Sequence, residues 1–263
     1  MVYYLEPRSE KKTLSNANGA HQAIFRQAGE CGLLVEFGDA LDDRINNAVH
    51  AFDARLRREQ ISGISETAPT IRSVLVRFDP LETPPEILRT KLSEILQERD
   101  WLASPPPENR SLWRIPTLYG GAEGPDMSEV AELLSMSEDA AIEQHSSTRQ
   151  RVYMLGFAPG FTYLGPLPEA WNLPRLTEVK PEIPPGSICV AVRQTVLCST
   201  TIPTGWRLIA RTPFRSFHVD RDPAFLLDAG DEVIFEAIDK SLYDRLSETA
   251  SKGGFVGSRE RLS

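Results

Sequence analysis

Gln194 is the polar residue whose position most invites a chemical explanation. We expect residues 187–199 to form one strand, whose alternation places Gln194 on an otherwise apolar face. The other members of that face are Ile188, Val190, Val192, Val196 and Cys198. A buried amide without a partner costs on the order of 1–3 kcal/mol. Gln194 therefore either hydrogen-bonds the backbone of a neighbouring strand or faces a polar ligand, and the sequence leaves both alternatives open.

Three arginines lie where predicted strands meet loops. Arg72 is expected on the apolar face of a strand, Arg175 follows a Leu-Pro pair, and Arg211 ends an apolar stretch. A guanidinium group presents a fork of donors that suits a carboxylate or a phosphate. A ligand-binding role is open for each arginine, although an internal salt bridge is the simpler explanation for any single one.

A loop rich in aromatic residues follows the first strand expected after residue 150. Phe157, Phe161 and Tyr163 fall within seven residues around a Pro-Gly turn. Aromatic side chains are costly to leave in water. They either pack at a barrel corner or line a ligand site, and the sequence alone does not choose between the two.

His145 and the cysteines have simpler explanations. His145 lies at the end of a predicted helix, where the helix dipole favours a cation, so a capping role is preferred to a role in a site. Cys198 has no basic neighbour in the sequence to activate it and is expected to be a packed thiol. The three cysteines show no CxxC spacing, which argues against a zinc site or a disulfide framework and favours a reducing, cytoplasmic compartment.

Composition and missing motifs exclude several classes of function. The net charge of −8 is unfavourable for binding nucleic acid or anionic lipid. There is no GxxxxGK[ST] loop, no HExxH and no GxSxG, so autonomous nucleotide hydrolysis through a P-loop and classical serine hydrolysis are not expected. No apolar run approaches the ~18 residues of a membrane span, and the N-terminal residues become charged too early for a secretory signal.

The number and positions of the prolines predict how the chain divides into domains. Twenty prolines among 263 residues indicate many short strands and loops. The run Ser-Pro-Pro-Pro-Glu-Asn at 104–109 is expected to be extended and solvated. The expected segments are a mobile tail at 1–28, a small α/β domain at 29–103, a linker at 104–110 and a β-barrel domain at 111–263.

Hydrophobic periodicity predicts the secondary structure of both domains. In the first domain we expect strands at 33–37 and 71–78, a helix at 41–56 and a second helix opened by Pro84-Pro85. In the second domain, Asp126 and Glu129 have the spacing of a capping box. There we expect helices at 126–134, 137–146 and 240–249, and strands at 152–157, 187–198, 206–211 and 231–238. This pattern predicts an α+β fold, with a small α/β domain followed by a barrel.

Several motifs follow one another in a fixed order along the chain. They are Arg72-Ser73, Ile115-Pro-Thr-Leu-Tyr119-Gly-Gly, His145-Ser-Ser, Tyr153-Met-Leu-Gly-Phe-Ala-Pro-Gly-Phe161-Thr-Tyr163-Leu-Gly, Pro174-Arg175, Gln194-Thr195, Gly205-Trp206 and Arg211-Thr-Pro213. The series resembles the allophanate hydrolase subunit 1 family, which includes the B subunit of 5-oxoprolinase and the sporulation-kinase inhibitor KipI and is built on a carboxyltransferase domain. The resemblance covers about residues 29–240.

The resemblance implies a fold, partners and a reaction. The second domain is expected to be a cyclophilin-like β-barrel that pairs with a second cyclophilin-like protein of the subunit 2/C type. In 5-oxoprolinase members a third, amidohydrolase-like subunit joins the pair. The chain would then be a non-autonomous subunit of an ATP-dependent amide or lactam hydrolase, with ATP acting in the assembled complex and no metal held by this chain.

The resemblance also implies site residues. Catalytic roles are expected for His145, Arg175, Gln194 and Arg211, and substrate binding for Arg72, Tyr119, Phe161 and Tyr163. One departure from the family pattern concerns the segment around the glutamine, where glycines of the family's run are replaced by larger residues in 192–199. Because this change removes places where backbone approaches a ligand closely, a KipI-like regulator that inhibits a histidine kinase without catalysis is the alternative.

Overall fold

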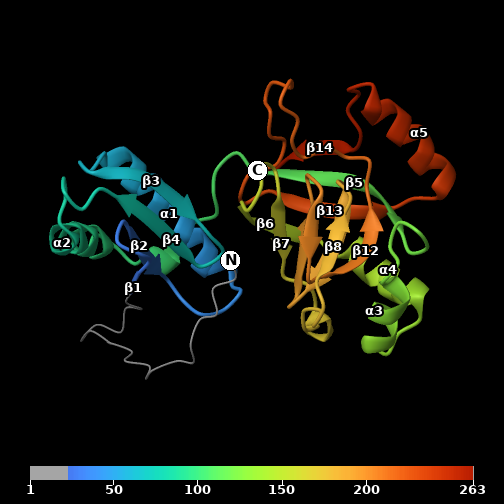
Figure 1. Ribbon diagram of the computed structural model, residues 1–263, viewed down its shortest axis with the longest axis horizontal. Helices are drawn as coiled ribbons and strands as arrows, with labels where there is room; N and C mark the ends of the chain where they lie inside the picture. Colours follow the sequence, from blue (N-terminus) through green and yellow to red (C-terminus); the bar gives the residue numbers. More distant parts are fainter. Residues whose placement is uncertain (1–22, 263) are drawn as a thin grey trace. The chain divides into compact units, whose positions relative to one another are not determined.

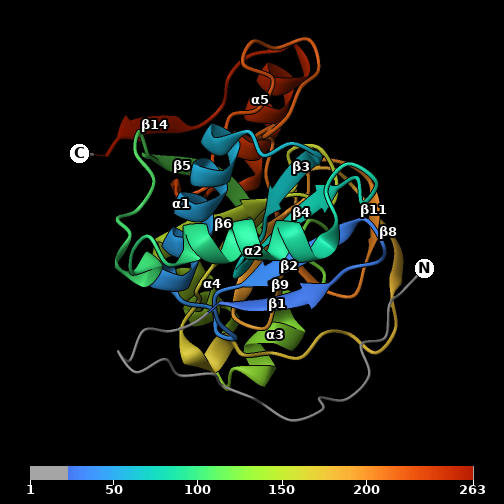
Figure 2. The same cartoon turned by 90° about the vertical axis from the view of Figure 1, so that its left-hand side faces the viewer.

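The structure is a computed structural model that describes residues 23–262, and these residues form two compact units (Figures 1 and 2). The division falls between Pro105 and Pro106, inside the proline-rich stretch. Residues 1–22 of the expected tail lie outside the described residues. The remainder of that tail contains strand β1 (Ile24–Gln27), which pairs with β2 (Gly32–Glu36), so the first unit begins before residue 29.

The first unit is a four-stranded sheet covered by helices. Its strands run in the order β1-β2-β4-β3, and all neighbours are antiparallel. The remaining elements are β3 (Ile64–Pro69), β4 (Ser73–Phe78), α1 (Asp43–Glu59), α2 (Pro85–Leu96) and the short η1 (Trp101–Ala103).

The two helices of this unit start and stop at residues suited to those places. The Asp42 carboxylate accepts a hydrogen bond from the Arg44 amide at 2.7 Å and caps α1, which ends where Gln60 takes a left-handed conformation. Pro85 occupies the first position of α2, as predicted. The helices and the sheet share one buried core, to which Val49, Phe52 and Leu88 contribute fully buried side chains.

The second unit is built on a sheet that closes into a barrel. Its strands run in the order β12-β9-β10-β7-β6-β13-β5, and β12 pairs with β5 to close the ring. The strands are β5 (Ser111–Tyr119), β6 (Gln150–Leu155), β7 (Thr162–Gly165), β9 (Ser187–Ala191), β10 (Gln194–Leu197), β12 (Arg207–Arg211) and β13 (Glu232–Ala237). The expected α+β fold is therefore confirmed.

Shorter elements complete this unit. β14 (Ser258–Arg261) pairs with the start of β5, and a separate ribbon is formed by β8 (Lys180–Ile183) and β11 (Ile202–Thr204). The helices are α3 (Met127–Leu133), α4 (Glu138–Ser147), α5 (Lys240–Ser251) and the one-turn η2 (Glu169–Trp171). Figure 1 shows α3 and α4 together at one end of the barrel and α5 apart from them. None of the described helices is long and apolar enough to span a membrane.

Strand alternation separates the barrel interior from an outer apolar face. On β9, Ile188 and Val190 point into the interior core, whereas Cys189 belongs to the outer cluster. The outer cluster also holds Val196 of β10 and Ile183 of the β8–β11 ribbon. The second unit thus has two distinct apolar clusters, one inside the barrel and one outside it.

The expected single strand over 187–199 is wrong. Val192 and Arg193 both adopt left-handed backbone, with φ of 46° and 63°, and turn the chain back on itself. Ala191 pairs directly with Gln194 across the resulting hairpin. A two-residue loop of this kind keeps paired residues on the same face of the hairpin. Gln194 therefore shares a face with Ala191, and Ile188 points to the other face. Such a turn commonly contains Asn-Gly, whereas this one contains Val192-Arg193.

The expected capping box at the start of α3 is also wrong. The Asp126 side chain makes no capping bond. It accepts instead from Lys180 Nζ at 2.6 Å and from the Leu208 amide at 2.7 Å. Glu129 likewise pairs with Arg207 rather than with the helix terminus. By contrast, Ser137 caps α4 as its position predicts, accepting from the Ala140 amide.

Candidate functional site

The outer face of the barrel brings together four of the residues expected in a site. Phe161 and Tyr163 from β7 and its approach have ring centroids 5.4 Å apart, and Tyr163 lies 6.2 Å from Trp206. The guanidinium carbon of Arg175 lies 5.5 Å from the centroid of the Trp206 ring, within cation–π range. We call Phe161, Tyr163, Arg175, Gln194 and Trp206 the outer-face cluster.

Gln194 reaches this cluster through strand register. Val196 pairs with Tyr163 on the neighbouring strand, and Gln194 lies two residues earlier on the same face of β10. Its side chain is half-buried and makes no hydrogen bond to any residue in 23–262. No described group hydrogen-bonds the side-chain amide of Gln194. The alternative in which this amide ties neighbouring strands together is therefore wrong.

The charged and phenolic groups of the outer-face cluster keep their hydrogen-bonding capacity. Arg175 is exposed, and its contact in the described part of the chain is the ring of Trp206. Burial raises the pKa of Tyr163, an effect that the neighbouring Arg175 partly opposes. Tyr163 is thus a protonated donor at neutral pH.

Buried groups behind the cluster hold it in place. Cys198 is buried beneath it, so the prediction of a packed thiol is confirmed. The Asp126–Lys180 ion pair joins the start of α3 to strand β8, which contributes Ile183 to the outer apolar cluster. The aromatic rings therefore rest on a packed and cross-linked face rather than on a free loop.

The outer-face cluster presents groups whose chemistry suits a planar amide. Aromatic faces accept a flat, partly apolar ligand, and the Gln194 amide offers both a donor and an acceptor to a lactam C=O and N–H. A guanidinium near the ligand oxygen stabilises negative charge that develops there. The cluster contains no nucleophile activated by a base, so the chemistry that its groups could supply is binding and polarisation.

His145 and Tyr119 lie elsewhere, in the interior at one end of the barrel. His145 is fully buried, with Nδ1 2.8 Å from the Tyr119 hydroxyl and Nε2 3.0 Å from Thr195 Oγ1. Tyr119 also lies 3.2 Å from the Phe235 carbonyl, which only accepts. Tyr119 therefore donates to Phe235, His145 donates from Nδ1 to Tyr119, and Thr195 donates to Nε2.

Burial keeps this histidine neutral. It lowers the pKa of His145 to about 3, and the ring stacks on Phe235 at 5.5 Å between centroids. The predicted role as a charged helix cap is wrong, because the imidazole carries no charge at neutral pH. Its contacts tie α4 to β5 and β10. Thr195 is its second partner, and no pattern in the sequence had indicated this residue.

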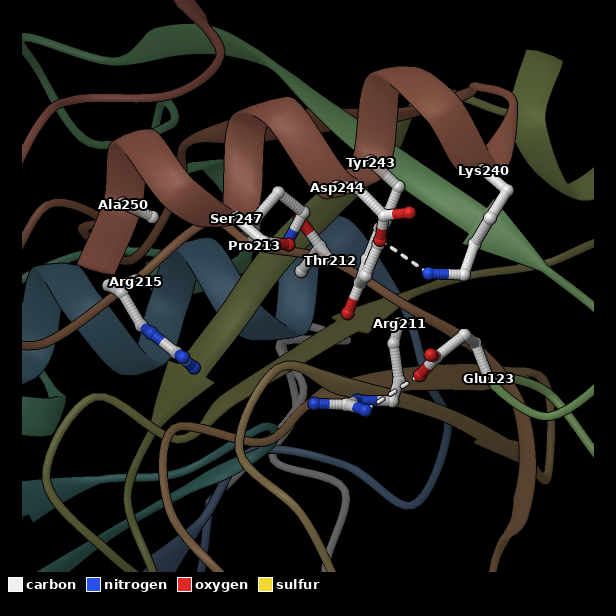
Figure 3. A pocket seen from close by; sticks show the side chains of 10 residues that line it. All are labelled: Glu123, Arg211, Thr212, Pro213, Arg215, Lys240, Tyr243, Asp244, Ser247 and Ala250. Carbon is white, nitrogen blue, oxygen red and sulfur yellow. Dashed lines mark hydrogen bonds and ion pairs between the residues drawn. The ribbon is translucent and has the colours of Figure 1, made fainter. Parts of the chain in front are cut away.

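Arg211 and Arg72 lie in two further places. Arg211 ends β12 and forms an ion pair with Glu123 at 2.6 Å beside a cavity under α5 (Figure 3). Arg72 belongs to the first unit, where it is exposed, donates to the Asp39 carbonyl at 2.9 Å and lies 3.8 Å from Glu36. Its expected place on the apolar face of β4 is wrong, because β4 begins at Ser73.

Comparison with protein families places most of the chain in one family. Residues 23–227 match the family model described as carboxyltransferase domain, subdomain C and D. The chain is 34% identical over 237 residues to the 5-oxoprolinase B subunit of Bacillus subtilis strain 168, covering 86% of this chain and 98% of the relative. It is 42% identical over 153 residues to the protein of the same name from Escherichia coli O157:H7, covering 57% of this chain and 69% of the relative.

Solved structures agree with the fold. The crystal structure of TTHA0988 is 28% identical with a TM-score of 0.66, covering 82% of this chain and 40% of that one. The chain thus spans less than half the length of that structure. The Kluyveromyces lactis urea carboxylase superposes with a TM-score of 0.76 at 19% identity, over 91% of this chain and 24% of the enzyme. This second likeness concerns the fold alone.

Proposed function

The chain belongs to the family of the carboxyltransferase domain, subdomains C and D, and we propose that it is a non-autonomous subunit of an ATP-dependent lactam hydrolase of the 5-oxoprolinase type. The observation that carries the proposal is the match to the Bacillus subtilis 5-oxoprolinase B subunit, which extends over almost the whole length of that protein. A match of that extent includes nearly every region of the relative that could contribute to its role.

The proposed role of this chain is to bind and polarise the lactam. The outer-face cluster would hold the ring against Tyr163 and Trp206, with Gln194 on the amide and Arg175 near the carbonyl oxygen. Transfer of the terminal phosphoryl group of ATP to that oxygen, with release of ADP, makes the amide carbon electrophilic. A first water adds to the carbon and the C–N bond breaks, which releases the amine and leaves an acyl phosphate. A second water hydrolyses the acyl phosphate to the carboxylate and inorganic phosphate. Nothing in this sequence of steps requires a nucleophile from this chain.

The proposed assembly includes partners that supply the missing parts. A second cyclophilin-like protein of the subunit 2/C type would complete the site, and an amidohydrolase-like protein would contribute further groups. Phe157 supports an intermolecular arrangement, because it extends the aromatic face to the exposed surface. Its side chain is 74% exposed and its ring lies 5.4 Å from Phe161.

Reconstitution tests the proposal. Each protein and the mixed complex are assayed for conversion of 5-oxoproline to glutamate with and without ATP, and ADP and phosphate are measured in parallel. We expect no turnover by this chain alone, and one ADP and one phosphate per glutamate in the complex. Turnover by the isolated chain would refute the non-autonomous role. An intact complex that is inactive, together with a chain that inhibits a histidine kinase, would favour the regulatory alternative.

A further inference from the structure

A cavity of about 310 Å³ lies between α5 and the segment that leaves β12 (Figure 3). Arg211 ends β12 and Trp206 lies just before its first residue, so the two are five residues or ~16 Å apart along an extended strand. The cavity is therefore separate from the outer-face cluster, and its lining shares no residue with that cluster.

Cationic side chains from three segments line the cavity. Arg211 comes from the end of β12, Arg215 from the loop that follows, and Lys240 from the first turn of α5. Two of these cations have acidic partners, since Arg211 pairs with Glu123 and Lys240 pairs with Asp244. These two acids are the acidic side chains of the lining, so the cavity carries one positive charge in excess.

Arg215 is the source of that excess. Its guanidinium makes no ion pair or hydrogen bond to any residue that the structure describes between 23 and 262, and Figure 3 shows it directed into the space beneath α5. Arg211 also points into this space (Figure 3), but its ion pair with Glu123 offsets its charge, so Arg215 is the cation of the lining that remains without an acidic partner among the described residues.

Tyr243 adds a neutral donor on the α5 wall. The side chain is 7% exposed, and Figure 3 shows its hydroxyl directed toward Arg211. Burial raises the pKa of Tyr243, so the hydroxyl stays protonated at neutral pH. A protonated phenol donates a hydrogen bond to an anion without adding negative charge of its own.

We propose that this cavity binds the oxyanion of a small molecule, with Arg215 as its principal partner and the Tyr243 hydroxyl as a second donor. The volume is at the lower end of ligand sites, which span ~300–1,000 Å³, and suits a small acid. Carboxylate and phosphate share this chemistry. A carboxylate would come from a small acid such as glutamate, the product under the proposed function on which this source rests, whereas inorganic phosphate would be a product or regulator.

Calorimetric titration of the full chain without partners or ATP tests the site. The probes are glutamate, 2-amino-1,5-pentanediol, which has the same carbon chain with alcohols in place of the carboxylates, and inorganic phosphate, each at low ionic strength. We expect saturable binding of glutamate or of phosphate, and none of the diol. Binding of glutamate identifies the carboxylate source, and binding of phosphate alone identifies the phosphate source.

Matched variants locate the binding. Arg215→Ala should weaken the affinity at least tenfold, and Tyr243→Phe, which keeps the ring, should weaken it several-fold. Arg245→Ala is the control, because Arg245 also lies on α5 but is exposed, bonds Ser241 and does not line the cavity. Competition by 0.5 M NaCl should abolish binding.

The proposal is overturned by any of three results. They are no binding of either anion, equal binding of the diol and glutamate, and parent-like affinity in Arg215→Ala. Because the titration requires no turnover, a reconstituted complex that fails to hydrolyse the lactam would refute the proposed function while leaving this result unaffected.

Discussion

The barrel interior around His145 and the outer-face cluster around Gln194 use similar polar residues in opposite ways. Both nitrogens of His145 are hydrogen-bonded by the protein, and burial keeps the ring uncharged. The side chains of Gln194 and Arg175 make no hydrogen bond or ion pair within the described residues, and Arg175 is exposed. Polar groups that saturate each other hold a fold together, whereas groups left unsaturated at a surface are available to a ligand.

Removal of His145 gives the largest expected effect on stability. His145→Ala leaves a void in the core and orphans the hydrogen bonds of Tyr119 and Thr195. Core truncations of aromatic size cost ~3–5 kcal/mol, and we expect a loss of that order in the free energy of unfolding, measured by urea denaturation. His218→Ala is the matched control, since His218 lies outside the buried core, and it should change stability by less than ~0.5 kcal/mol. A loss below ~1 kcal/mol in His145→Ala would contradict the structural role.

The neutral state of His145 predicts a pH dependence of stability. Its folded pKa is about 3, below the ordinary value of ~6.5, so the unfolded chain binds a proton between these limits and the folded chain does not. Stability therefore falls as the pH drops below ~6.5, by about 2 kcal/mol from this residue between pH 7 and pH 5.

Comparison of variants isolates that contribution. The loss between pH 7 and pH 5, measured by urea denaturation, should be smaller by about 2 kcal/mol in His145→Gln than in the parent, because glutamine does not titrate. Gln97→Ala, which replaces an exposed side chain that does not titrate, should retain the parent dependence. Parallel curves for the parent and His145→Gln would show that His145 is charged in the folded protein.

Gln194→Ala should have the smallest effect on stability and a clear effect on function. Because the Gln194 side chain has no hydrogen-bond partner among the described residues, its removal should change the free energy of unfolding by less than ~0.5 kcal/mol. Lactam hydrolysis by the reconstituted complex should fall about tenfold, because the contacts of the Gln194 amide with the lactam are lost. Gln97→Ala, at an exposed position after α2, is the control for both measurements. A large loss of stability with full activity per folded molecule would make Gln194 part of the scaffold and remove the contrast with His145.

Local patterns were sufficient for much of the architecture. Helical spacing of apolar residues located α1, Pro85 located the start of α2, and Ser137 located the cap of α4, because each signal acts over a few neighbouring residues. The order of motifs along the chain was sufficient for the family, which the comparisons confirm.

The composition of the sites depended on contacts between residues far apart in the sequence. The Asp126 side chain binds Lys180 and Leu208, 54 and 82 residues away, instead of capping α3. His145 is neutral because residues distant in the sequence, such as Tyr119 and Phe235, bury its ring. The turn at Val192 and Arg193 places Gln194 on the face opposite to the predicted one. No local sequence signal predicts left-handed backbone at a β-branched residue such as Val192. The cavity beside Arg215 exists only because α5 folds back over the loop after β12. Sequence periodicity specifies which face of an element is apolar, whereas the protonation, partners and accessibility of a polar group depend on what the folded chain packs against it.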